Sequence, residues 1–102
     1  MNGYVLGADA AIDLDNIWEY IAADSVKAAD RWIEKLFDAF ETIARSPGIG
    51  RRRGDLTVHP VLFWPVEAYL IIYRAVPGKP VEIVAVTQGS RDIPSFLSSR
   101  LP

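Results

Sequence analysis

Apolar residues in the first half of the chain recur at the spacing of helices. A short apolar run, Tyr4-Val5-Leu6, predicts a first strand. Helical spacing then follows over about residues 9–22, with Asp9 as the expected N-cap. A second helix, capped by Asp24 or Ser25, carries one long apolar stripe from Val26 to Ala44. Because few residues separate the two helices, they are expected to pack antiparallel as a hairpin.

After Pro47 the pattern changes to that of strands. Three apolar runs with short connections follow, at about residues 56–65, 69–76 and 81–88. Short connections favour an antiparallel meander. Pro60 and Pro65 lack the N–H that a sheet ladder needs, so the first run is expected to be irregular or to lie at an edge.

The last two of these runs are apolar on both faces, so the sheet has to be covered on both sides. The helical hairpin can cover one face. The tail with Ile93, Phe96 and Leu97 covers only part of the other, and a partner is expected to cover the rest. The prediction is one α+β domain over residues 1–102, ordered β-α-α-β-β-β. In it the helical hairpin packs on a small antiparallel sheet that the first strand joins, and a short C-terminal tail or helix follows.

Composition narrows the possible chemistry. The chain of 102 residues is 50% hydrophobic, enough for one core, and has no cysteine for disulfides or thiolate zinc sites. Its acids are scattered without histidine neighbours and it has no phosphate-binding glycine motif, so neither a metal nor a cofactor is expected.

The longest apolar stretch is interrupted by Pro60, Pro65 and Glu67, unlike a membrane span. The start of the chain lacks signal-peptide features, so the expected location is the cytoplasm.

Charge is unevenly distributed along the chain. Residues 1–46 hold nine acids and four bases, whereas residues 47–102 hold seven bases and four acids. Arg51, Arg52 and Arg53 form a loop between Gly50 and Gly54. This loop is either a solvated connection or a surface that binds a target. Seven bases are too few to predict nucleic-acid binding from charge.

Five short stretches carry residue patterns that occur together, in this order, in one superfamily: Asp13–Ile21, Ala28–Ile33, Ser46–Arg51, Tyr69–Arg74 and Val84–Asp92. Together with the order of elements, they resemble the RelE/ParE superfamily of bacterial toxins over nearly the whole chain. The resemblance implies the toxin of a type II toxin–antitoxin (plasmid stabilisation) system. It also implies a ParD-like antitoxin as partner in a hetero-oligomer. The implied activity is either inhibition of DNA gyrase, as in ParE, or ribosome-dependent mRNA cleavage, as in RelE.

The residues favour the ParE-like activity. Cleavage of RNA needs a base, an acid and cations around the scissile phosphate. Leu70 stands where RelE-like nucleases often carry Arg, and Leu97 stands where a C-terminal Tyr is expected. The single histidine, His59, has no adjacent acid to orient it. We therefore expect no catalytic residues and a protein that acts by binding, not an enzyme. A RelE-like nuclease and a non-toxic interaction module of the same fold remain the alternatives.

Two sets of residues are candidates for binding. The target-binding candidates are basic or tail residues: Arg51, Arg52, Arg53, Arg74, Arg91, Phe96 and Arg100. The antitoxin-binding candidates are Trp18, Trp32 and Trp64, of which Trp64 is expected to be the most exposed.

Several of these positions also have structural interpretations. Arg74 either pairs with Glu82 or is displayed for a partner, and Asp92 is a good N-cap for a short C-terminal helix. The acids of the first helix, Asp9, Asp13 and Asp15, are attributed to its dipole.

Overall fold

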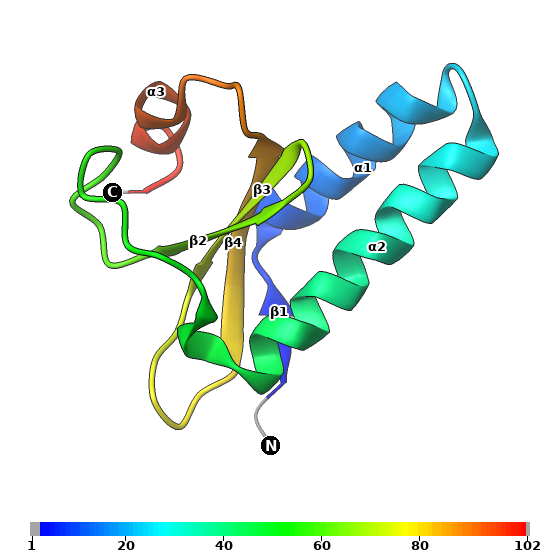
Figure 1. The fold of residues 1–102 in the computed structure, drawn as a ribbon. Helices are drawn as coiled ribbons and strands as arrows, with labels where there is room; N and C mark the ends of the chain where they lie inside the picture. Colours follow the sequence, from blue (N-terminus) through cyan, green and yellow to red (C-terminus); the bar gives the residue numbers. More distant parts are fainter. Residues whose placement is uncertain (1–2, 102) are drawn as a thin grey trace.

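The computed structural model describes residues 3–101 and confirms the predicted α+β order (Figure 1). Along the chain the elements are β1 (Tyr4–Leu6), α1 (Ala8–Ala22), α2 (Val26–Arg45), the short 3₁₀ helix η1 (Pro47–Ile49), β2 (Leu62–Val66), β3 (Tyr69–Arg74), β4 (Val81–Gln88) and α3 (Ile93–Ser98). Within residues 3–101, no helix has the length and apolar character needed to cross a membrane.

The four strands form one sheet in the order β1-β4-β3-β2. The meander β2-β3-β4 is antiparallel, as predicted, whereas β1 lies parallel to β4. The sheet is therefore mixed and not wholly antiparallel. The helical hairpin returns the chain to the end of the sheet at which β1 began. Consequently β2 runs in the direction of β1, and after two reversals β4 does so too.

The sheet separates two apolar layers (Figure 1). On one side α1 and α2 bury a core with the sheet: Ala10, Leu14, Ile17, Leu36, Phe40, Ile43, Tyr69, Ile71, Tyr73, Val81, Ile83 and Val86. On the other side α3 and the segment before β2 bury a second core: Val61, Phe63, Ile72, Val84, Ala85, Ile93, Phe96, Leu97 and Leu101. The chain itself thus covers much of the face that the sequence analysis assigned to a partner.

The predicted strand over residues 56–65 is wrong in its first part. Residues 53–61 form turns instead, with Leu56 and Thr57 both donating their N–H to the carbonyl of Arg53. Pro60 cannot donate to a ladder, so the chain bends there and Val61 enters the second core. The strand begins only at Leu62. The turns fold this segment over the sheet face and not along its edge.

A β-bulge explains why β4 does not alternate. Ile72 pairs with Ala85 while the next residue, Tyr73, pairs with Ile83, which leaves Val84 as an extra residue. Val84 and Ala85 therefore both contribute to the second core, whereas Ile83 and Val86 contribute to the first.

Side-chain caps define two helix starts. Ser25 accepts a hydrogen bond from the N–H of Ala28, so it is the N-cap of α2. Asp92 caps α3 by accepting from the N–H of Ser95, as predicted. The expected cap of α1 is wrong, because Gly7 occupies the N-cap position and Asp9 lies in the first turn.

A buried phenol fastens the exit of α2 to the centre of the sheet. The hydroxyl of Tyr73 donates to the carbonyl of Pro47 at 2.7 Å and accepts from the N–H of Gly50 at 2.8 Å. Burial raises the pKa of Tyr73, which keeps this donor protonated. Gly50 approaches the ring so closely that an added Cβ would lie 2.5 Å from the phenol oxygen.

We predict that Gly50→Ala lowers the free energy of unfolding by about 1–3 kcal/mol, because the methyl group has to displace a buried, hydrogen-bonded ring. Gly48→Ala is the matched control: a Cβ there meets no atom within 4 Å. Urea denaturation of both variants provides the comparison. Equal stability of the two would contradict the proposed contact.

Candidate functional site

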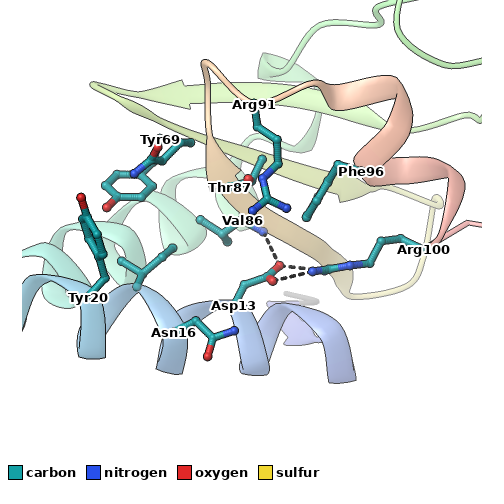
Figure 2. A pocket seen from close by; sticks show the side chains of 11 residues that line it. Asp13, Asn16, Tyr20, Tyr69, Val86, Thr87, Arg91, Phe96 and Arg100 are labelled. Atoms are coloured by element: carbon teal, nitrogen blue, oxygen red, sulfur yellow. Dashed lines mark hydrogen bonds and ion pairs between the residues drawn. The ribbon is translucent and has the colours of Figure 1, made fainter.

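A cavity of about 300 Å³ opens between α1, the end of β4 and α3 (Figure 2). It is lined by Ile17, Val86 and Thr87 and by the aromatic side chains of Tyr20, Tyr69 and Phe96. The remaining lining residues are polar or charged: Asp13, Asn16, Gln88, Arg91 and Arg100. The cavity lies where an early and a late part of the chain meet, because residues of α1 and residues that follow β4 both line it.

Asp13 and Arg100 form a buried ion pair beside this cavity (Figure 2). The two guanidinium nitrogens of Arg100 donate to the two carboxylate oxygens of Asp13 at 2.9 and 2.7 Å. Asp13 also accepts from the backbone N–H of Val86 at 3.0 Å, and it is only 6% exposed. Hydrogen bonding to Asp13 raises the pKa of Arg100.

The attribution of Asp13 to the dipole of α1 is therefore wrong. Asp13 lies three residues after Ala10 and four before Ile17, both of which are buried. That spacing places Asp13 on the inner face of α1, and it is the signal in the sequence from which its burial could have been predicted.

Phe96 is buried and holds two arginines against its ring. The guanidinium carbons of Arg91 and Arg100 lie 4.9 and 4.3 Å from the ring centroid. These three target-binding candidates are thus in contact. Their roles differ, however, because Arg100 pairs with Asp13, whereas within residues 3–101 no carboxylate lies within 4 Å of the Arg91 guanidinium.

Arg74 lies far from this group. It pairs with Glu82 at 3.0 Å, so the pairing interpretation is confirmed. The β3–β4 register places Arg74 opposite Glu82 at one end of the ladder and Tyr69 opposite Gln88 at the other. Arg91 follows the Gln88 end. At ~3.3 Å per residue the two ends are ~16 Å apart, so Arg74 and Arg91 do not lie side by side.

The arginine loop lies at the outer edge of β2. Arg51 forms an isolated bridge with Phe63, and each backbone N–H donates to the carbonyl of the other residue. Arg53 donates two hydrogen bonds to Asp55, which raises the pKa of Arg53 and lowers that of Asp55. Within residues 3–101, neither Arg51 nor Arg52 pairs with an acid.

The three tryptophans lie at separate places. Trp64 is half-buried, as are Trp18 and Trp32. With Phe63, Pro65 and Leu70 it lines a groove of about 420 Å³ beside Arg51 and Arg53. Trp18 lines a second groove of about 250 Å³ over the helical hairpin, together with Leu6, Ala11, Leu14, Asp15, Ile33 and Phe37.

Trp32 has a packing role on the other side of the hairpin. Its ring stands edge-on to Tyr69, with ring centroids 5.1 Å apart, and Lys35 lies over it. His59 lies in the turns before β2 and is not among the residues that line the cavity with Arg91. Within residues 3–101, no group of three or more His, Cys, Asp or Glu side chains is placed to hold a metal ion.

Comparisons with known proteins give one family. Residues 4–93, from β1 to the start of α3, match the family described as the ParE toxin of the type II toxin–antitoxin system parDE. No curated protein matches the chain. Among solved structures, a chain described as the chromosomal ParDE TA system from P. aeruginosa is similar, with a TM-score of 0.71 and 22% sequence identity. The match covers 86% of this chain and 96% of that chain, and at this identity it shows a shared fold.

We predict that Asp13→Ala lowers the free energy of unfolding by about 3–5 kcal/mol, because it leaves a partly buried arginine without its partner. The double variant Asp13→Leu/Arg100→Met should recover part of this loss, since it removes both charges. Asp55→Ala, which breaks an exposed pair with Arg53, should leave the urea midpoint unchanged. Equal midpoints for Asp13→Ala and Asp55→Ala would show that the buried pair has no special role.

Proposed function

The chain belongs to the ParE toxin family of type II toxin–antitoxin systems, and from this premise we propose that it inhibits DNA gyrase by binding. In the same proposal, a ParD-like antitoxin neutralises it in a hetero-oligomeric complex in the bacterial cytoplasm. The similar solved structure comes from a ParDE system, which supports an antitoxin partner of that kind. A gyrase inhibitor of this type need not cleave DNA itself, because it is enough to stabilise one state of the enzyme.

The placement of the polar side chains supports binding over catalysis. Cleavage of RNA would need a base and cations at one point. Arg74 and Arg91 lie at opposite ends of the β3–β4 ladder, and His59 lies outside the cavity that contains Arg91. Arginine does not give up its proton near neutral pH, so Arg91 can hold an anion but cannot act as a base.

The open edge of the sheet and the groove beside it support an antitoxin site. The carbonyl of Gly3 accepts from the N–H of Val81, and the N–H of Gly7 donates to the carbonyl of Ile83. In a parallel ladder every second residue bonds to the neighbouring strand, so alternate residues from Gly3 to Gly7 face β4. The backbone groups of Tyr4 and Leu6 therefore face the open edge, where an extended segment can add as a strand. The groove containing Trp18 lies next to β1, since Leu6 lines it, and its apolar walls suit one face of an amphipathic helix.

The arginine loop supports a target surface separate from that groove. Arg51 and Arg52 are exposed, and beside them lies the groove lined by Trp64. An aromatic side chain next to arginines is a combination that is common at binding hot spots. The loop is held at Arg51 by the bridge to Phe63, and at Arg53 by hydrogen bonds from the N–H groups of Leu56 and Thr57 to its carbonyl.

We predict that the purified protein, mixed with gyrase, supercoiled plasmid and ATP, causes linear DNA to accumulate after the gyrase is denatured. The cognate antitoxin should abolish this accumulation. Loss of intact mRNA in a translating extract, without any effect on plasmid, would instead identify a RelE-like nuclease. Absence of both effects would contradict the proposed inhibition of gyrase.

We predict that Arg51→Gln/Arg52→Gln weakens gyrase inhibition about tenfold or more, equivalent to ~1.4 kcal/mol. Antitoxin affinity should change less, because these arginines lie away from the Trp18 groove. Arg53 stays unchanged in this variant since its pair with Asp55 shapes the loop. Arg45→Gln/Lys79→Gln removes the same charge elsewhere and is the control. Inhibition as strong as that of the control would exclude the loop from the target surface.

A further inference from the structure

The cavity of Figure 2 contains a positive charge that residues 3–101 leave without a carboxylate. Arg91 follows β4, and Figure 2 shows its side chain directed into the cavity between Tyr69 and Phe96. The one acid that lines the cavity is Asp13, and its two oxygens are taken by Arg100 and by the N–H of Val86. Asp13 and Arg100 compensate each other, so Arg91 sets the local charge.

Arg91 is exposed, but one face of its guanidinium rests on a buried aromatic ring. Its guanidinium lies over Phe96, which Arg100 contacts as well, and Arg100 is fixed by its two hydrogen bonds to Asp13. A cation–π contact of this kind restricts a long side chain, which therefore loses less entropy on binding. Phe96 itself is fixed by its burial in the second core, so Arg91 and Arg100 rest on one ring that does not move with them.

These features select a carboxylate over a phosphate. A single guanidinium presents two parallel N–H groups, which match two oxygens of a carboxylate or of a phosphate alike, so the charge of the cavity makes the distinction. A phosphate dianion would have one uncommitted arginine to neutralise it and would lie near the negative charge of Asp13. The amides of Asn16 and Gln88 also line the cavity and can hydrogen-bond a carboxylate.

The cavity and the Trp18 groove lie on roughly opposite faces of α1. At about 100° per residue, Asp13, Asn16 and Tyr20 point one way, while Ala11, Asp15 and Trp18 point the other way. A partner in the groove therefore does not have to enter the cavity. Tyr20 stands at the rim with 71% of its surface exposed, where it can pack against residues next to a bound side chain.

We propose that this cavity receives an acidic side chain, Asp or Glu, of the protein that the toxin targets, with Arg91 as the residue that binds it. The identity of the occupant as part of the target rests on the proposed function. The carboxylate site itself does not, because it follows from the charge and geometry of the cavity.

A titration of ¹⁵N-labelled protein with the blocked residue N-acetyl-glutamate amide tests the site without any partner. Saturable shifts of the Arg91 side-chain N–H and the Thr87 amide are expected, with at least tenfold weaker binding in Arg91→Gln. Arg45→Gln should bind as the unchanged protein does. N-acetyl-glutamine amide should cause no saturable shift. Equal binding by Arg91→Gln, no saturation, or tighter binding of inorganic phosphate at Arg91 would overturn the proposal.

Growth arrest on induced expression tests the occupant. Arg91→Gln and Arg91→Lys should each reduce growth arrest, the latter because lysine lacks the paired donors. Both should still bind the antitoxin, which reports that they are folded, and Arg45→Gln should arrest growth fully. Full arrest by Arg91→Gln would show that the target does not use the site. Failure of the unchanged protein to arrest growth contradicts the proposed function, and with it the proposal that the occupant of the cavity belongs to the target. The carboxylate site is decided separately, by the titration.

Discussion

The central strands β3 and β4 carry apolar side chains on both faces, and this constraint organises the rest of the chain. A sheet of this kind is stable only between two layers. The helical hairpin forms one layer, in which each amphipathic helix turns one apolar face toward the sheet. The other layer is assembled from shorter pieces, namely the turns before β2 and the helix α3, and buries nine side chains. A chain of 102 residues uses its C-terminal part for this purpose, so the tail belongs to the core.

Two polar contacts hold these layers in register. Tyr73 belongs to the sheet and fixes the chain where it leaves α2, so it determines where the loop toward β2 starts. Asp13 and Arg100 are 87 residues apart and join α1 to the end of the second layer. A buried ion pair adds little net stability, because desolvation of the two charges offsets their attraction. Its effect here is to fix one position for the tail, which in turn shapes the cavity containing Phe96 and Arg91.

Local features of the structure could be predicted from the sequence, whereas contacts between distant residues could not. Ser25 and Asp92 act as caps within their own helices, and Arg74 meets Glu82 across one hairpin, so a few neighbouring residues determine each of them. The apolar residues of the segment before β2 fit the pattern of a strand, whereas its turns depend on the burial of Val61 in the second core. The burial of Phe96 and the pairing of Asp13 with Arg100 depend on the tertiary fold. The period and spacing of apolar residues along the chain carry little information about such contacts.

The way the arginines are used connects the fold to the proposed binding function. Arg53, Arg74 and Arg100 each pair with an acid of the chain, so their charge contributes mainly to the fold. Arg51, Arg52 and Arg91 do not pair with an acid within residues 3–101, and they lie at two places, the edge of β2 and the cavity beside α3. One fold can serve catalysis or binding, depending on the side chains it presents. In the cavity, the carboxylate of Asp13 accepts from Arg100 and from the N–H of Val86, while Arg91 has no acid partner within residues 3–101. The same ion pair that orders the tail thus occupies the one carboxylate lining this cavity, and this arrangement underlies the proposal that the site binds an anion.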